Sequence, residues 1–152
     1  MTDRGDRSDV ARITIQPYRG ALIASIQVDL EERVLRRFQS DLLECIRSSD
    51  ADVAIIDLSG VDVMDGEDFA GLRRVIEMAA LMGTGSVLCG MQPGVAASLV
   101  DLDVSLDGLE ISRSLDAALA QVAAKEQVPE PEDLEPREIV NGSERDEAPD
   151  PE

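Results

Sequence analysis

Between Val10 and Lys125, hydrophobic residues follow two spacings, one typical of strands and the other typical of helices. Ile13 and Ile15 alternate with polar neighbours, which predicts a half-buried strand. Only the turn-forming segment 17–20 separates it from a second apolar run, so we expect these two strands to pair antiparallel. Further strand-like runs follow at longer intervals. The predicted strands cover residues 13–16, 21–28, 53–58, 86–89 and 109–111.

Helical spacing fills the longer intervals between the strands. In each of them, apolar residues recur every three or four positions and polar residues occupy most of the rest. Gly83 is a typical helix end, Pro93 suits a first helical turn, and Ser114 is a candidate N-cap. The predicted helices cover residues from about 30 to 48, 65 to 82, 94 to 102 and 115 to 124.

This order of elements predicts an α/β fold with a small mixed β-sheet, mostly parallel, packed by helices mainly on one face. We expect three segments: a flexible N-terminus at 1–9, the folded domain at 10–125, and a disordered acidic tail at 126–152. The tail holds eleven acids against two arginines, and its apolar residues are too sparse to offset the entropy of ordering it.

The whole chain of 152 residues has a formal net charge of −18, which disfavours binding to nucleic acids or to anionic membranes. It contains neither a long apolar run nor a secretory signal, so we expect a cytoplasmic protein. Histidine is absent, which excludes His-dependent triads and His zinc sites. Cys45 and Cys89 lie in apolar patterns without metal-type spacing, so we expect buried thiols rather than reactive ones.

Acidic residues gather in segment 57–68, between a predicted central strand and the next helix, at the edge of the sheet where functional sites often lie. One hypothesis is a Mg²⁺ or phosphoacceptor site, weakly similar to a phosphoaspartate receiver domain. The chain lacks the receiver's acidic pair after the first strand, and its single lysine, Lys125, is not at the receiver position. The other hypothesis is that the acids cap the helix and suit its positive first turn. The first hypothesis concerns Asp57, Asp62, Asp65, Glu67 and Asp68, and the second concerns Asp65 as the N-cap with Glu67 and Asp68 in the first turn.

A second polar segment, 90–94, reads GMQPG and leads into a predicted helix. A glycine-rich turn before a helix can hold a phosphate. This segment lacks the Lys and Ser/Thr of a P-loop, so a plain turn with proline at the first helical position is the favoured interpretation.

Segment 55–65 (IIDLSGVDVMD) and segment 87–99 (VLCGMQPGVAASL) follow each other in a specific order and spacing. Together they resemble a STAS domain of the anti-sigma-factor-antagonist type, most of all the RsbS-type scaffold proteins of bacterial stressosomes. The resemblance covers about residues 10–123, which is nearly the whole predicted folded part. Its further matching stretches are 22–30, 38–43, 82–83, 102–109 and 114–119.

This resemblance implies a STAS fold and a non-enzymatic regulatory module that binds other proteins without a cofactor. Such proteins hold an RsbT-like serine kinase and assemble with RsbR-like STAS paralogues into large particles, so we expect a homo-oligomer, as a dimer or a larger assembly. In the family, the kinase phosphorylates a hydroxyl directly after the Asp of the first motif and is then released. A phosphate adds a charge of about −1.5 to −2 to the docking surface.

The chain departs from this pattern at Gly66, the residue after that Asp, which has no hydroxyl to phosphorylate. A second family position, used in RsbR-type paralogues, falls on Cys89. Two interpretations stay open: Glu67 and Asp68 place fixed negative charge where the phosphate would lie, or the loop serves a partner that needs no switch. The residues that we expect to dock a partner are Ser59, Gly60, Asp62, Asp65, Gly66, Glu67, Asp68, Met91, Gln92 and Pro93.

Two other classes of function are alternatives to this one. The first is a phosphorelay-like α/β domain whose acidic loop binds Mg²⁺ or a small ligand. The second is a purely structural homo-oligomer, in which the acidic tail acts as a solubilising layer.

Overall fold

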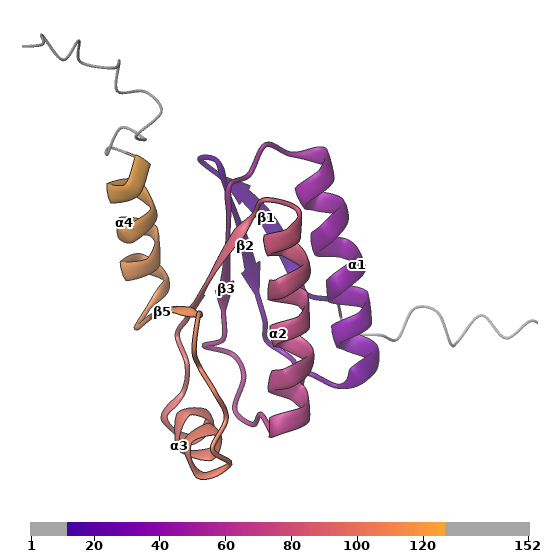
Figure 1. Ribbon diagram of the computed structural model, residues 1–152, viewed down its shortest axis with the longest axis vertical. Helices are drawn as coiled ribbons and strands as arrows, with labels where there is room; N and C mark the ends of the chain where they lie inside the picture. The colour runs from indigo at the N-terminus through magenta and orange to yellow at the C-terminus, as the bar shows by residue number, and fades with distance from the viewer. Residues whose placement is uncertain (1–11, 127–152) are drawn as a thin grey trace, which may run out of the picture.

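The computed structural model describes residues 12–126, which form a five-stranded sheet and four helices (Figure 1). Both the fold class and the predicted order of the elements are confirmed. The strands are β1 (Thr14–Tyr18), β2 (Ala21–Ser25), β3 (Val53–Asp57), β4 (Gly85–Cys89) and β5 (Glu110–Ser112). The helices are α1 (Glu32–Ser48), α2 (Gly66–Leu81), α3 (Pro93–Asp101) and α4 (Leu115–Glu126).

The strands lie in the sheet in chain order, from β1 at one edge to β5 at the other. The pair β1–β2 is antiparallel, as the short connection predicts, and the other three pairs are parallel. The carboxyl ends of β3 and β4 therefore lie side by side, with Asp57 opposite Cys89. This alignment brings together the two loops that the sequence analysis selected.

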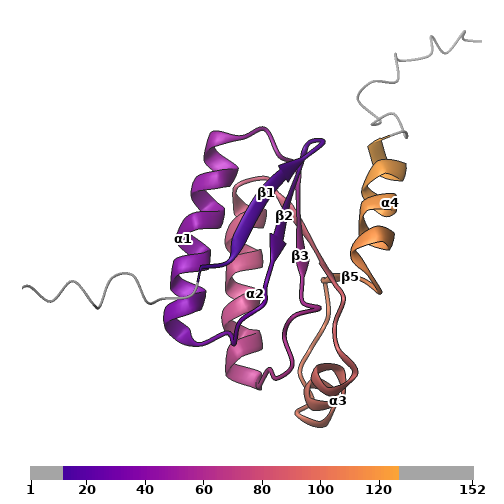
Figure 2. The ribbon, with the colours of Figure 1, turned by 180° about the vertical axis from the view of Figure 1, so that it is seen from behind.

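Helices α1 and α2 cover one face of the sheet, whereas α4 lies on the other (Figure 2). The main core joins Phe38 of α1 and Phe69 of α2 to Ile56 of β3, each of them at most 1% exposed. A smaller cluster joins Ile55 of β3 to Ala118 of α4. The larger core thus lies on one face, as expected, and α4 covers the second face because β3 and β4 carry apolar residues on both sides.

Several elements end at other residues than expected. β1 continues through Pro17 to Tyr18, which is tolerated because β1 is an edge strand and one of its sides needs no N–H donor. β2 ends at Ser25 instead of Val28. Directly after Ser25, the N–H of Ile26 donates to the carbonyl oxygen of Asp57 at 3.0 Å, and the chain turns toward α1.

The ends of α2 follow the predicted signals closely. Asp65 is the N-cap, and Gly83 adopts a left-handed φ of +88° directly after the C-cap. Within residues 12–126, no helix combines the length and hydrophobicity that a bilayer span requires. The expected flexible N-terminus at 1–9 and nearly all of the expected tail, from residue 127 onward, lie outside the described residues.

Candidate functional site

The candidate site is the loop of residues 58–65, which leaves the carboxyl end of β3 and enters α2; we call it the docking loop. Three of its hydrophobic residues, Leu58, Val61 and Met64, are at most 1% exposed and fix it to the core. The residues between them, including Ser59, Gly60 and Asp62, are exposed. Alternation of buried and exposed residues therefore presents the polar groups of the loop on the surface.

A capping box joins the end of the docking loop to the start of α2. The N–H of Asp68 donates to Oδ1 of Asp65 at 2.8 Å, and the N–H of Asp65 donates to Oδ2 of Asp68 at 3.2 Å. Each carboxylate thus satisfies a backbone donor that the first helical turn leaves unpaired. The predicted N-cap role of Asp65 is confirmed, and the side chain of Asp68 completes a capping box that was not predicted.

Partial burial raises the pKa of Asp68 above its usual range, and the neighbouring carboxylates of Asp65 and Glu67 also raise it. The hydrogen bond from the Asp65 N–H acts in the opposite direction. Glu67 itself is exposed, in the first turn of α2. Of the two acids after Gly66, only Glu67 is therefore without a capping role.

The loop after β4 holds the docking loop from the side. Nε2 of Gln92 donates to the carbonyl oxygen of Ser59 at 2.7 Å, and the N–H of Leu58 donates to the carbonyl oxygen of Cys89 at 2.8 Å. A side chain on Gly90 would come within 2.7 Å of Oδ1 of Asp57, so the glycine permits this close approach. The same Oδ1 accepts from the N–H of Ser59 at 3.0 Å.

Helix α3 lies along the docking loop. A Cβ built on Gly94 lies 3.9 Å from the carbonyl oxygen of Asp62, and Oγ of Ser98 donates to the carbonyl oxygen of Met64 at 3.4 Å. These two contacts are four residues apart on α3 and two residues apart on the loop. The same spacing continues with Leu102 and Gly66, because Cδ1 of Leu102 lies 3.9 Å from a Cβ built on Gly66.

Gly60 and Gly66 have opposite surroundings. A Cβ on Gly60 would lie 2.8 Å from the carbonyl oxygen of Ile26 and 2.8 Å from Cα of Gln27, both of them backbone atoms. At Gly66, the nearest heavy atom to the Cβ is that of Leu102, at an ordinary van der Waals distance. Gly60 is therefore required by packing, whereas the structure leaves room for a side chain at Gly66.

The site residues expected after β4 are placed less uniformly. Pro93 is exposed at the first position of α3, as predicted, and Gln92 is its N-cap. Met91 is partly buried and packs against the main core. Packing against the core is enough to explain why a hydrophobic residue stands at this position.

Sequence reasoning did not select the exposed hydrophobic residues beside the loop. Val63, Val100 and Leu102 are 70%, 73% and 54% exposed. All three belong to the docking loop or to α3 and its C-cap. The sequence held one hint of this surface, because Val63 stands in an acidic segment between Asp62 and Asp65. The sequence alone does not show that its side chain is exposed.

The acids of the segment do not form a metal site, because no group of three or more His, Cys, Asp or Glu residues in 12–126 is arranged to hold a metal ion. Asp57 faces Gly90 and Ser59, while Asp65 and Asp68 face each other. Within the described residues, these acids therefore do not converge on one point.

Both cysteines are free thiols, and Cys89 is fully buried as expected while Cys45 is partly exposed. Burial, and secondarily the charge of Asp57, raises the pKa of Cys89 to about 11. Burial also raises the pKa of Cys45, with further contributions from Asp41 and Glu44. Neither thiol has the lowered pKa that a nucleophile needs at neutral pH.

Comparison with known proteins gives a match to the sequence model of the STAS domain family over residues 12–118. A segment of 65 residues is 38% identical to the RsbT co-antagonist protein RsbRC of Bacillus subtilis (strain 168). That segment is 43% of this chain and 23% of the relative, so the match spans less than a quarter of the relative's length.

Two solved structures have the same fold. The first is an RsbS variant of Moorella thermoacetica with a serine-to-glutamate substitution, with a TM-score of 0.66 and 24% identity over 78% of this chain and 100% of that one. The second comes from work described as the molecular architecture of the stressosome, with a TM-score of 0.66 and 23% identity over 76% of this chain and 100% of that one. At these identities the two structures support the fold alone.

Proposed function

The chain belongs to the STAS domain family, and we propose that it is a non-enzymatic regulatory module that acts by binding other proteins. The match to a protein named as an RsbT co-antagonist supports this role. The site supports it as well, because the docking loop offers exposed acids and hydrophobic residues on a braced backbone. We propose that it acts in the cytoplasm.

We further propose an RsbS-type role, in which the chain assembles with RsbR-like STAS paralogues and holds an RsbT-like serine kinase. The docking loop and the start of α2 present four acids, Asp62, Asp65, Glu67 and Asp68. The matching surface of a partner would therefore carry basic residues around an apolar centre that covers Val63. Ser59, Gly60, Gly66, Met91, Gln92 and Pro93 complete the proposed docking surface.

One observation carries the mechanism: Gly66 directly follows the capping Asp65, at the first position of α2, where a Cβ would make only an ordinary contact, 3.9 Å, with Cδ1 of Leu102. The surrounding capping box is intact although the residue carries no hydroxyl. We infer that the loop keeps a docking geometry but has no phosphorylation switch at this position. The kinase would be held until another component of the assembly is modified.

The phosphomimetic alternative has less support from the geometry. A phosphate would add about −1.5 to −2 charge at position 66 and present its oxygens outward. The carboxylate of Asp68 instead accepts from the Asp65 N–H, which leaves Glu67 with a single outward charge. One exposed carboxylate in the first turn of a helix is a weak substitute for a phosphate.

The assembly is tested by light scattering of the full chain, alone and mixed with an RsbR-type paralogue and an RsbT-like kinase. The proposal expects a large particle that retains the kinase. A large particle that excludes the kinase would favour the phosphomimetic alternative. A monomer or dimer that ignores both proteins would contradict the stressosome role and leave the family membership intact.

The missing switch is tested with Gly66→Ser, whose Cβ would meet Leu102 only at an ordinary contact distance, and with Gly66→Ala as the matched control. After incubation with the kinase and ATP, mass spectrometry should find a phosphate on the serine variant and none at 66 in the control. Phosphorylation should then release the kinase from the particle. A phosphate on Ser59 of the parent chain would overturn the proposal that this loop has no switch.

A further inference from the structure

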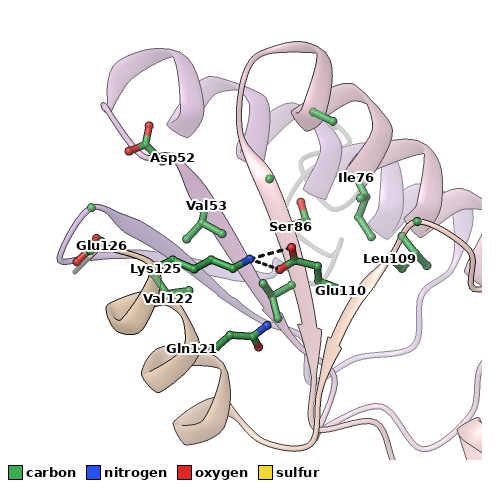
Figure 3. Close-up of a pocket in the computed structure, with 15 residues that line it drawn as sticks. Asp52, Val53, Ile76, Ser86, Leu109, Glu110, Gln121, Val122, Lys125 and Glu126 are labelled. Atoms are coloured by element: carbon green, nitrogen blue, oxygen red, sulfur yellow. Dashed lines mark hydrogen bonds and ion pairs between the residues drawn. The ribbon is translucent and has the colours of Figure 1, made fainter. Parts of the chain in front are cut away.

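Helix α4 covers mainly one half of its face of the sheet. Its buried residue Ala118 forms one cluster with Ile55 of β3 and Val87 of β4, and the helix packs further against β5. Nζ of Lys125 lies 2.9 and 3.0 Å from the two carboxylate oxygens of Glu110, and this ion pair fixes the last turn of α4 on the β5 side (Figure 3). The other half of the face, on β1 and β2, is left largely open.

A set of uncharged side chains lines this open half, and we call it the open strip. Directly opposed residues of paired strands point to the same side of a sheet. Ile23 lies opposite Ile55, and Gln16 lies opposite Ile23, so both point to the side that carries α4. Tyr18 is 45% exposed there. By the same register, the open strip consists of exposed or partly exposed residues, namely Thr14, Gln16, Tyr18, Ile23 and Ser25.

The open strip carries no charge, although 30% of the residues of the chain are charged. Interface cores are likewise poor in charged residues and rich in aromatic ones, and Tyr18 is the only tyrosine of the chain. A stable contact between two folded proteins, however, involves about 20 to 30 residues on each side. Five side chains on two short strands are too few for such a contact. The open strip therefore fits a short peptide segment and not a second copy of the domain.

The described part of the chain ends beside the open strip. α4 ends at Glu126, whose Oε1 lies 3.5 Å from a Cβ built on Gly20, in the turn between β1 and β2. In the same turn, Arg19 adopts a left-handed φ of +45° and places its guanidinium group 5.5 Å from the centre of the Tyr18 ring. Asparagine, aspartate and glycine are favoured in such turns, so backbone geometry does not explain the arginine. A base thus stands at the point where the acidic segment 127–133 begins.

The length and composition of the chain beyond Glu126 match the open strip. Segment 127–133 holds three acids and no base, and it can extend over about 23 Å. That is enough to turn back past Arg19, because β2 itself is about 17 Å long. Segment 134–140 (LEPREIV) then holds three of the four branched aliphatic residues beyond Glu126. In an extended chain, Leu134 and Val140 fall on the same side.

We propose that segment 134–140 of this chain lies along the open strip and covers Tyr18 and Ile23. The acids before it pair with Arg19, and its apolar side packs on the strip. Because the segment is tethered through a few residues, its effective concentration is in the millimolar range. A contact that is weak between separate molecules is therefore populated within one chain. The segment acts as a cover for the sheet and not only as a solubilising layer, and this contact is independent of the docking loop.

The fluorescence of Tyr18 reports directly on this contact, because the chain has no tryptophan and no other tyrosine. Acrylamide, an uncharged quencher, measures how freely solvent reaches the ring. Leu134→Ser combined with Val140→Ser removes the apolar contacts without changing the charge, and Asn141→Ser combined with Ala148→Ser is the matched control outside the segment. If the contact is half occupied in the parent, the first variant should raise the bimolecular quenching constant of Tyr18 about twofold. The control should leave that constant unchanged.

Ile23→Thr tests the open strip itself. It keeps a β-branched residue in β2 and removes part of the apolar surface that the segment would cover. It should raise the quenching of Tyr18 in the full chain and add nothing further in the variant that already carries Leu134→Ser and Val140→Ser. A rise of equal size in both backgrounds would be a local effect of the substitution and would contradict the docking.

The proposal is overturned if the parent, the segment variant and the control are quenched alike, which is the result that a purely solubilising tail predicts. It is also overturned if the protection of Tyr18 grows over about a hundredfold range of protein concentration, because mass action would then identify a second copy as the occupant. Protection by the chain's own segment does not depend on concentration. All measurements use the purified full chain alone, so none of them depends on whether it binds a kinase or paralogues.

Discussion

The two glycines of the docking region provide a direct test of how the loop is held. Replacing each one by alanine makes the same chemical change at positions six residues apart. The Gly60→Ala methyl group would lie 2.8 Å from the backbone of both Ile26 and Gln27, which is closer than real Cβ atoms come. The Gly66→Ala methyl group would lie 3.9 Å from a flexible leucine side chain.

The expected effects on stability have opposite signs. At Gly60 the loop or the β2–α1 connection must shift, and overpacking of this kind costs about 1 to 3 kcal/mol of unfolding free energy. At Gly66, in the first turn of α2, alanine limits the freedom of the unfolded chain without a clash and should stabilise by about 0.4 to 1 kcal/mol. In a domain of this size, about 1 kcal/mol corresponds to a melting temperature shift of roughly 4 °C.

Urea unfolding followed by far-UV circular dichroism measures both variants, because the chain has no tryptophan for a fluorescence assay. Equal m-values for the parent and both variants would show that the comparison concerns the folded state. The reasoning is refuted if Gly60→Ala is as stable as the parent, or if Gly66→Ala loses as much stability as Gly60→Ala. In either case the contacts of these glycines would not set the shape of the loop.

Two further predictions concern the supports of the fold. Nη1 of Arg73 donates to the carbonyl oxygen of Ser105 at 2.8 Å, and Nη2 donates to that of Asp107 at 2.7 Å. Arg73→Lys should therefore lower the unfolding free energy by about 1 to 2 kcal/mol. It should also speed amide exchange in residues 103–109. Unchanged exchange there would show that the arginine does not hold this segment. Burial raises the pKa of Cys89 to about 11 in the folded state, so this thiol should resist iodoacetamide at pH 8 longer than Cys45. Because the thiol ionises at lower pH in the unfolded chain than in the folded one, the unfolding free energy should fall as pH rises from 9 toward 11. Cys89→Ala should flatten that decline, and an equal decline in the variant would contradict the assignment.

Local signals in the sequence predicted the elements and the N-cap of α2 well. Asp65, followed three residues later by Asp68, sits directly before an apolar helical stripe, and both partners of a capping box lie within one turn. The ends of β1 and β2 were harder to predict. They depend on contacts between segments far apart in the chain, such as the hydrogen bond from Ile26 to Asp57.

The position of α4 and the open strip that it leaves could not be predicted for a related reason. The apolar stripe of α4 is visible in the sequence, but the choice of face depends on which sides of β3 and β4 the first two helices leave uncovered. The open strip depends further on the register of β1 and β2, which decides which of their side chains share the face with α4.

The contacts that fix the docking loop affect how tightly it could hold a partner, although it has no phosphorylation switch at Gly66. Gly94 and Ser98 of α3 contact the loop from one side, and Gln92 holds its first residues. The turn after β2 lies against Gly60 on another side. A loop fixed on several sides loses little conformational entropy when a partner binds, so more of the interaction energy remains as affinity. Under the proposed function, phosphorylation of such a loop would weaken the contact by adding charge, and a chain with glycine at position 66 would lack that route. Control of the complex would then have to act on the partner or on a neighbouring subunit.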